Sequence, residues 1–238
     1  MIIMKRDEIK AKIKLLAFQF GYREQNFGSC FGPYTEKYDE LYKWLKQAEN
    51  IPGDILEFGV ATGGTTCLIA DYIKSHASPK TIDSFDSFAG FAPKEFDDNV
   101  SLGYVTNPSV KYSWQTYEFS FAYVQRKLKA HKFFPFTSLH KGFFQDTLLE
   151  FLNQNDRLYS FALIDCDLAS SIDFCAKSIF PYMSTGGIIL FDDYASIEPN
   201  KPDTAYSFGV KKVVDQFVSE HSPSDHGYNN GLYHFVKS

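Results

Sequence analysis

Cysteine is scarce in this sequence, and the few cysteines follow no metal-binding or cross-linking pattern. The 238 residues contain four cysteines, at positions 30, 67, 166 and 175, and six histidines. The absence of a C-x-x-C pair, a zinc-ligand spacing or an H-x-x-x-H arrangement argues against a structural zinc site and a disulfide framework. We therefore expect reduced thiols that are mostly packed in the core.

Excess positive charge and long apolar runs are also lacking. The formal net charge is −5 and the sequence pI is about 5.7, so no sequence-wide basic field can hold a nucleic acid backbone. The apolar run from Met1 to Met4 is too short for a signal peptide, and no later run reaches membrane-spanning length. These absences predict a cytoplasmic protein that binds neither nucleic acid nor membranes.

The dinucleotide fingerprint G-x-G-x-x-G is missing, and a different glycine pattern stands in a similar place. Glycines fall at 59, 63 and 64, between an apolar run from Ile55 to Phe58 and a helical pattern that starts at Thr65. A strand, a glycine turn and a helix allow close backbone approach and offer unpaired helical N–H groups to a polar ligand. A tight turn that binds nothing is the alternative interpretation.

Apolar runs that alternate with helical patterns predict an α/β fold of one ordinary-sized domain. Repeated strand-then-helix units require a mostly parallel sheet that is buried on both faces and joined by right-handed crossovers. The expected strands cover residues 55–58, 80–85, 137–141, 159–165, 188–191 and 232–236. The expected helices cover 5–20, 34–48, a stretch that starts at 65, 114–130, 170–182 and 210–220.

Three segments outside these units have open roles. The two N-terminal helices could cover a sheet face, close over a pocket or pair subunits, and residues 28–33 between them are expected to form a loop. Residues 87–112 are rich in Gly, Pro, Asp and Asn. Because so long a connection is unusual, we expect this stretch to be an irregular lid or an insert.

Acidic residues follow three of the predicted strands. Asp86 lies near the end of the second strand, where an acid would hydrogen-bond a ribose diol in a cofactor-binding methyltransferase or a dehydrogenase. Asp165 and Asp167 follow the fourth strand, and Asp192 and Asp193 follow the fifth. If those two strands are neighbours about 4.8 Å apart, their ends bring four carboxylates into one small volume.

Carboxylates that lie so close repel one another unless a cation joins them or one takes a proton. Carboxylate oxygens suit hard divalent ions such as Mg²⁺, Mn²⁺ or Ca²⁺. The four aspartates therefore predict a divalent metal site at the carboxyl edge of the sheet. The alternative is that each Asp caps a helix or begins a turn.

Five segments together resemble the macrocin O-methyltransferase family, which includes metal-dependent sugar O-methyltransferases of natural-product biosynthesis. They are E-F-G-V-A-T-G-G at 57–64, D-S-F-A-G at 86–90, K-G-F-F-Q-D-T-L at 141–148, I-D-C-D-L at 164–168 and G-G-I-I-L-F-D-D-Y at 186–194. The E-x-G-x-x-x-G pattern in the first segment also resembles motif I of class I S-adenosylmethionine-dependent methyltransferases.

The resemblance implies a Rossmann-like class I methyltransferase fold: a mostly parallel seven-stranded sheet with helices on both faces, N-terminal helices and a lid loop. It divides the chain into an N-terminal helical extension at 1–50 and a methyltransferase domain at 51–238. By resemblance, Asp165, Asp192 and Asp193 would hold Mg²⁺ or another hard divalent cation, and Asp167 would be the general base, with Asp165 also catalytic. S-adenosylmethionine would be bound by Glu57, Gly59, Val60, Thr65, Asp86, Ser87, Gly142, Phe143, Phe144, Gln145 and Asp165.

The implied acceptor is a small molecule, a sugar or other vicinal diol whose two oxygens chelate the ion. Two departures concern the acceptor: A-S-S stands at 169–171 where the family commonly has Tyr-Glu-Ser, and Lys211 and Lys212 stand where it tends to show an arginine. The nearest alternative is a catechol-type O-methyltransferase. Further alternatives are a NAD-dependent Rossmann oxidoreductase, disfavoured by the glycine spacing, and a cofactor-binding module without activity. Pairing of two copies through the N-terminal helices is left open.

Overall fold

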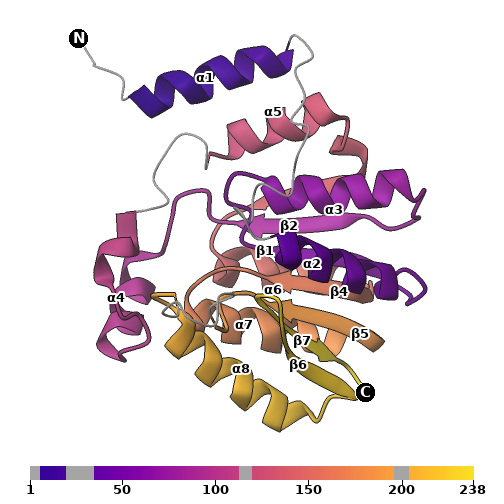
Figure 1. The fold of residues 1–238 in the computed structure, drawn as a ribbon, viewed down its shortest axis with the longest axis vertical. Coiled ribbons are helices and arrows are strands. Elements are labelled where there is room, and N and C mark those ends of the chain that lie inside the picture. The colour runs from indigo at the N-terminus through magenta and orange to yellow at the C-terminus, as the bar shows by residue number, and fades with distance from the viewer. Residues whose placement is uncertain (1–5, 20–34, 113–119, 196–203) are drawn as a thin grey trace.

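One seven-stranded sheet forms the centre of the fold (Figure 1). The computed structural model describes residues 6–19, 35–112, 120–195 and 204–238. The strands lie in the order β3-β2-β1-β4-β5-β7-β6. They are β1 (Asp54–Phe58), β2 (Ile82–Asp86), β3 (Thr137–Lys141), β4 (Tyr159–Ile164), β5 (Met183–Phe191), β6 (Asp225–Asn229) and β7 (Leu232–Val236).

Strand pairing agrees with the predicted architecture. β1 to β5 pair in parallel, and β7 runs antiparallel to both β5 and β6. β4, in the middle of the sheet, is buried along its whole length, as expected for a parallel strand covered on both faces. The predicted mostly parallel, seven-stranded Rossmann-like sheet is therefore confirmed.

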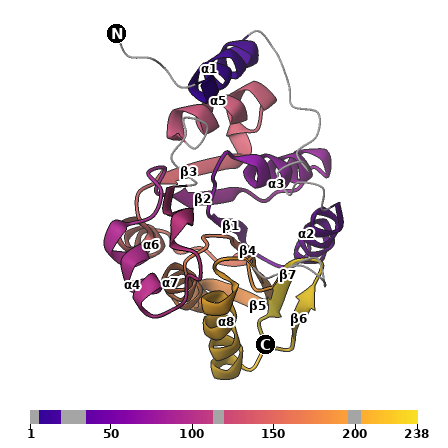
Figure 2. The same ribbon diagram turned by 60° about the vertical axis from the view of Figure 1, so that its left-hand side comes forward.

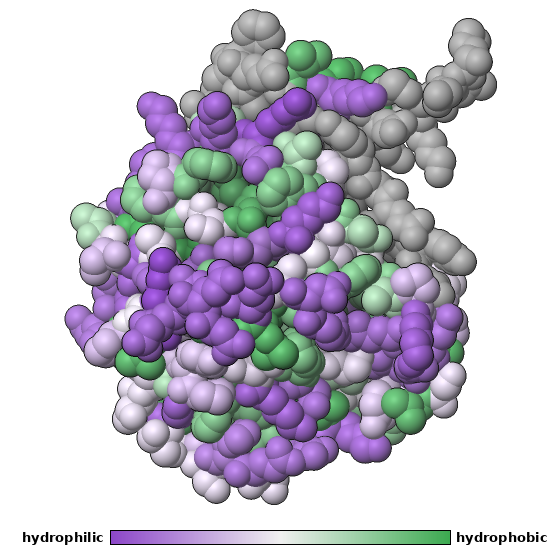
Figure 3. All heavy atoms as spheres, turned by 180° about the vertical axis from the view of Figure 1, so that it is seen from behind, coloured by the Kyte–Doolittle hydropathy of each residue, from purple (hydrophilic) through white to green (hydrophobic). Residues whose placement is uncertain are grey.

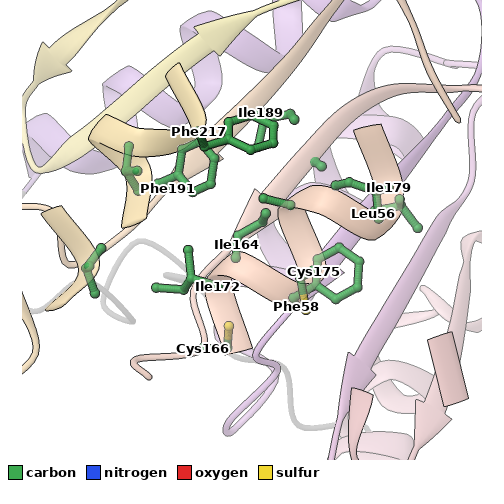
Figure 4. Packing of buried hydrophobic residues seen from close by; sticks show 14 of the residues in the cluster. Leu56, Phe58, Ile164, Cys166, Ile172, Cys175, Ile179, Ile189, Phe191 and Phe217 are labelled. Carbon is green, nitrogen blue, oxygen red and sulfur yellow. The ribbon is translucent and has the colours of Figure 1, made fainter. Parts of the chain in front are cut away.

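Helices cover both faces of the sheet (Figure 2). On one side lie α2 (Thr35–Ala48), α3 (Gly64–Ser75) and α5 (Phe121–His131), and on the other α6 (Phe144–Gln154), α7 (Ala169–Ile179) and α8 (Ser207–His221). Figure 4 shows how Phe58, Ile164 and Phe191 of the strands meet Ile172 of α7 and Phe217 of α8. This buried apolar layer holds the strand ends in fixed positions.

The second predicted N-terminal helix, α2, packs directly on the sheet. Its apolar stripe of Leu41, Trp44 and Leu45 is buried in one cluster with Ile55 of β1 and Ile69 of α3. Helical spacing places these side chains on one face, which explains why the segment folds against the strands. The domain boundary after residue 50 stays a prediction.

Helix α1 (Arg6–Gln19) lies beside α5. Its Ile9, Ile13 and Leu16 side chains remain 45–59% exposed. The face of the molecule drawn in Figure 3 is largely hydrophilic, with apolar residues in small separate patches. Pairing of two copies through the N-terminal helices stays a prediction.

The stretch at 87–112 is more ordered than its composition suggests. It contains the helix α4 (Pro93–Ser101) and the 3₁₀ turn η2 (Pro108–Tyr112), so the expectation of an irregular segment is wrong for those residues. Pro93 stands in the first turn, where its missing N–H costs nothing. Phe96 and Asn99, three residues apart on one face, are buried. With two buried residues, this helix has too few apolar positions to give a recognisable helical pattern in a sequence rich in Asp, Asn, Gly and Pro.

Several boundaries also differ from expectation. β5 begins at Met183 rather than 188. α6 was not expected, and it begins at Phe144, inside the predicted 142–145 turn. β6 was not expected either, because its residues are mostly polar and it pairs with β7 at the edge of the sheet. α5 begins at Phe121 behind the cap Ser120, while the expected helix start at 114 and the expected 28–33 loop lie outside the described residues. Two further 3₁₀ turns are η4 (Phe134–Phe136) and η5 (Phe180–Tyr182).

Cys67, Cys166 and Cys175 are reduced and buried, as expected, and Cys30 lies outside the described residues. In the described ranges, every helix falls short of the length and apolar character that a membrane crossing requires.

Candidate active site

A cavity of about 560 Å³ opens at the carboxyl ends of the parallel strands. This edge is where open α/β sheets bind their ligands. The loops after the first five strands build the wall, together with α4 and one side chain from α2. The predicted site residues in the wall are Gly59, Val60, Thr65, Asp86, Ser87, Gly142, Phe143, Phe144, Gln145, Asp165, Asp167, Asp192 and Asp193.

The glycine turn after β1 depends on left-handed backbone. Gly59 has a φ of 94°, and its N–H donates to the carbonyl oxygen of Phe85 at 3.0 Å. Gly63, with a φ of 71°, precedes α3, which begins at the cavity wall with Gly64 and Thr65. The first N–H groups of a helix have no partner within it, so this wall offers donors to a polar ligand.

Asp86, at the end of β2, holds this turn in place. Its Oδ2 atom accepts hydrogen bonds from the N–H groups of Val60 at 2.8 Å and Ala61 at 3.0 Å. Its Oδ1 atom accepts from the N–H of Phe88 at 2.6 Å. The neighbouring Ser87 hydroxyl donates to the carbonyl oxygen of Gly90 at 2.7 Å. Asp86 therefore fixes two loops of the cavity, and its predicted contact with a ribose diol stays a prediction.

Glu57 lies beneath the cavity rather than in its wall. The side chain is fully buried, and its Oε2 atom accepts a hydrogen bond from the Thr66 hydroxyl at 2.7 Å. Its Oε1 atom has no hydrogen-bond partner among the residues described. Burial raises the pKa of Glu57 to about 7, against the opposing effects of the nearby Ser84 and Thr66 hydroxyl groups. In this structure Glu57 supports the turn from below, and its role at the cofactor stays a prediction.

Gly142 and Phe143, together with the first residues of α6, form another part of the wall. Gly142, with a φ of 149°, donates its N–H to the carbonyl oxygen of Asp86 at 3.0 Å, which ties this turn to the end of β2. Phe144 packs edge-on against Phe58, with ring centroids 5.7 Å apart. The predicted 142–145 segment thus lines the cavity next to the end of β2, although Phe144 and Gln145 already belong to α6. Its contact with the adenine ring stays a prediction.

The aspartates after β4 and β5 meet at the same cavity because these strands are hydrogen-bonded neighbours. Burial, followed by the charge of Asp192, raises the pKa of Asp165 well above its ordinary value. Burial and the charge of Asp193 do the same for the pKa of Asp167. Burial and the charge of Asp192 raise the pKa of Asp193 to about 6. The predicted convergence of four carboxylates is present.

Two of these aspartates have unusual backbone. Asp167 has a φ of 61° and Asp193 a φ of 57°, in the left-handed region. Around Asp167 the chain turns sharply, because the N–H of Leu168 donates to the carbonyl oxygen of Cys166 at 2.6 Å. Aspartate tolerates this region better than most residues, yet the conformation costs free energy and is concentrated at functional sites.

Lys37 enters the acidic cluster from α2. Its Nζ atom donates a short hydrogen bond to Oδ2 of Asp192, and its side chain is only 16% exposed. The pKa of Lys37 is raised: burial lowers it, and the charges of Asp192, Asp165 and Asp193 more than compensate. The protein therefore supplies one positive charge to the cluster from its own chain.

A hard divalent cation suits this donor set, since the four side chains offer only carboxylate oxygens and repel one another. Within the described ranges, however, no three His, Cys, Asp or Glu side chains already form a group that could hold a metal ion, and Lys37 contacts Asp192 at the same place. The chemistry fits a metal, and the predicted metal dependence stays a prediction.

Sequence reasoning missed the wall residues that come from distant segments: Lys37, Phe91, Glu95, Thr204 and Tyr206. Lys37 had a usable signal. It stands four residues before Leu41 and seven before Trp44, so helical spacing puts this lysine on the apolar stripe of α2. The others lie in segments without a recognisable pattern.

Comparison with known proteins gives a family and a fold. The model of the family Macrocin-O-methyltransferase (TylF) matches residues 36–217. Demethyldecarbamoylnovobiocin O-methyltransferase of Streptomyces niveus is 26% identical over 185 residues, which are 71% of this chain and 63% of that protein. The match thus spans less than two thirds of this curated relative.

Two solved structures share the fold. The O-methyltransferase NovP has a TM-score of 0.65 and 20% identity, over 84% of this chain and 79% of that one. The calicheamicin methyltransferase CalS11 has a TM-score of 0.65 and 19% identity, over 99% of this chain and 94% of that one. The predicted class I O-methyltransferase fold is confirmed.

Proposed function

The chain belongs to the macrocin O-methyltransferase family, and from this premise we propose that it transfers a methyl group from S-adenosylmethionine to a hydroxyl group of a small molecule. The observation that carries the proposal is the one cavity shared by the glycine turn and four aspartates. Solved O-methyltransferases of the same fold are complexes with this donor or with S-adenosylhomocysteine.

In the proposed complex, the cofactor lies along the glycine turn, Asp86 and the 142–145 turn. The acidic wall suits a donor that carries a sulfonium and an ammonium charge, because opposite charges attract strongly in a partly desolvated site. Methyl transfer is a displacement from a good leaving group, so the protein mainly has to hold the reactants in line. Such orientation can supply about 7–11 kcal/mol of the barrier.

We assign Asp167 as the general base that takes the proton of the attacking hydroxyl. It lines the cavity beside Asp165 and Asp193, at the sharp turn after β4. The turn fixes where the carboxylate sits, and a base must lie within hydrogen-bond reach of the proton it removes.

We further propose that Asp165, Asp192 and Asp193 hold Mg²⁺ or another hard divalent cation. A bound cation would orient a diol and lower the pKa of its hydroxyl. Lys37 already neutralises part of the cluster through Asp192, so a metal would share this carboxylate with Lys37 or displace it.

The acceptor that these features support best is a sugar or another vicinal diol. The Streptomyces niveus relative is named a demethyldecarbamoylnovobiocin O-methyltransferase, and CalS11 is described as a TDP-rhamnose 3'-O-methyltransferase. The aromatic wall residues Phe88, Phe91, Phe143, Phe144 and Tyr206 keep a catechol-type acceptor as the second candidate.

The decisive experiment is a product-mass screen. The purified chain is incubated with S-adenosylmethionine and either methyl α-L-rhamnoside, TDP-rhamnose or catechol, with Mg²⁺ or with EDTA. We expect a gain of one methyl group on a sugar and loss of the product in EDTA. Turnover that persists in EDTA would reject the metal. Thermal stabilisation by NAD and not by S-adenosylhomocysteine would reject the methyltransferase.

A further inference from the structure

The helix α4 carries an acid into the cavity next to the aspartate cluster. Glu95, in the first turn of α4, lines the cavity and is half-buried. The helix is held by its buried Phe96 and Asn99 and packs against α7. Glu95 is therefore a fixed part of the wall, contributed by a segment that lies some seventy residues from α7 in the sequence.

Hydrogen bonds fix one oxygen of Glu95 against the start of α7. The hydroxyl groups of Ser170 and Ser171 both donate to its Oε1 atom, the first at 2.7 Å. The side-chain amide of Asn99 donates to the Ser170 hydroxyl oxygen at 2.7 Å, which orients that hydroxyl toward Glu95.

The second carboxylate oxygen of Glu95, Oε2, is not held by hydrogen bonds from the described part of the protein. Among the described residues, no hydrogen-bond donor contacts Oε2 of Glu95. This oxygen is also not fully buried, so a ligand can reach it. A carboxylate with one oxygen anchored and the other in a cavity is pre-organised to accept a hydrogen bond from a ligand. No catalytic step assigned above uses it.

An aromatic surface lies beside this carboxylate. Phe91 stacks on Phe96 with ring centroids 5.4 Å apart and meets Tyr206 edge-on at 6.0 Å. Both Phe91 and Tyr206 line the cavity with Glu95. An apolar ring face next to a fixed acceptor suits a sugar, which presents C–H groups on one side and hydroxyl groups at its edge.

The charged side chains in the cavity wall restrict which chemical groups an acceptor can carry. The described wall contains Asp86, Glu95 and the four clustered aspartates, and Lys37 is the one basic side chain among them. A carboxylate or phosphate group of an acceptor would be repelled at this place, whereas a hydroxyl or an amino group can donate to Glu95.

We infer that Glu95 is the specificity-determining residue of the acceptor site, where it accepts a hydrogen bond from a hydroxyl or amino group of a sugar ring. The inference rests on the proposed methyl transfer for the identity of the ligand. Ser170, Ser171 and Asn99 are positioning residues that hold the carboxylate.

The test compares Glu95→Gln and Glu95→Asp with the wild type, using methyl α-L-rhamnoside and catechol as acceptors. Loss of one charged hydrogen bond should raise KM for the rhamnoside about tenfold or more in Glu95→Gln, with kcat changed less than KM and partial recovery in Glu95→Asp. KM for catechol should stay unchanged, because catechol has no hydroxyl beyond its reacting pair. Asp98→Asn is the matched control, since Asp98 lies on the exposed side of α4 and pairs with Lys94.

A binding measurement separates this inference from the proposed reaction. Saturation-transfer NMR of methyl α-L-rhamnoside on the protein saturated with S-adenosylhomocysteine should show binding to the wild type and Asp98→Asn, and its loss in Glu95→Gln. Glu95-dependent binding without methyl transfer would reject the reaction and leave the subsite standing. Equal binding to all variants, or no binding to the wild type, would overturn the subsite.

Discussion

A Cβ atom on Gly59 would lie 1.7 Å from the carbonyl oxygen of Asp165. The end of β1 and the end of β4 therefore approach so closely that only glycine fits between them. The same contact joins the glycine turn to the first aspartate of the acidic cluster. Because Gly59 has no side chain, the proposed cofactor and metal sites can lie this close together.

Gly59→Ala should consequently damage both sites together. The clash with backbone cannot be relieved by a side-chain rotation, so we expect a loss of about 3 kcal/mol or more in the free energy of unfolding. S-adenosylhomocysteine affinity should fall as well, measured by calorimetry. Gly103→Ala is the control, since Gly103 also has positive φ, 70°, but nothing within 4 Å of the added Cβ. Equal losses of unfolding free energy in the two variants would show that the positive φ, rather than the contact with Asp165, requires glycine at position 59.

Asp167→Asn should separate activity from stability. Removing the proposed base should lower kcat about 10²- to 10⁴-fold. Removing one of several like charges should raise the melting temperature, because burial and Asp193 disfavour the ionised form of Asp167. Asparagine also tolerates the left-handed backbone at this position. Calorimetry with S-adenosylhomocysteine should give an unchanged affinity.

The exposed Asp71→Asn on α3 is the matched control for Asp167→Asn and should alter neither turnover nor stability. Unchanged turnover in Asp167→Asn would reject the base assignment. A lower melting temperature would show that Asp167 stabilises the fold.

Lys37→Met should make the fold depend on metal. The substitution removes the cation that contacts Asp192, and breaking a buried ion pair typically costs about 3–5 kcal/mol. We expect a lower melting temperature in EDTA, recovery in Mg²⁺, and tighter Mn²⁺ binding by electron paramagnetic resonance. Lys46→Met, at an exposed position of the same helix, should show none of these effects. Unchanged metal affinity in Lys37→Met would mean that Lys37 and a metal do not compete.

Much of the site was predictable because its parts follow strand ends. The sequence places Gly59, Asp86, Asp165 and Asp192 at the ends of predicted strands, and the carboxyl ends of parallel strands meet at one edge. The prediction of the acidic cluster also required the order of the strands in the sheet, because the four aspartates converge only if β4 and β5 are adjacent. That adjacency was assumed from the sequence and is observed.

The remaining features depend on contacts that sequence patterns do not encode. Glu95 meets Ser171 across 76 positions and Lys37 meets Asp192 across 155. Both contacts are set by how helices pack over the strand ends. β6 is held by its hydrogen bonds to β7, and Tyr228 is its one hydrophobic residue that packs against the core, so its mostly polar sequence gave no strand pattern.

Glu57→Gln should change how stability depends on pH. The pKa of Glu57 rises from 4.5 to about 7 on folding because the carboxyl is buried. Between these values the folded state binds more protons than the unfolded state, so stability falls as pH rises. The contribution of Glu57 is fully present below about pH 4.5 and is lost as pH rises through about 7. Since one pKa unit corresponds to about 1.4 kcal/mol, the loss amounts to about 3 kcal/mol.

Urea unfolding of the wild type and Glu57→Gln at half-unit steps from pH 5 to 8 measures this directly. Glutamine keeps an oxygen that can accept from Thr66, so both proteins should fold. The wild type should lose stability relative to Glu57→Gln up to about pH 7, and the difference should be constant above it. Subtracting the two curves cancels the titration of Asp193, whose pKa of about 6 lies in the same range. A difference that does not vary with pH would mean that Glu57 stays ionised beneath the glycine turn.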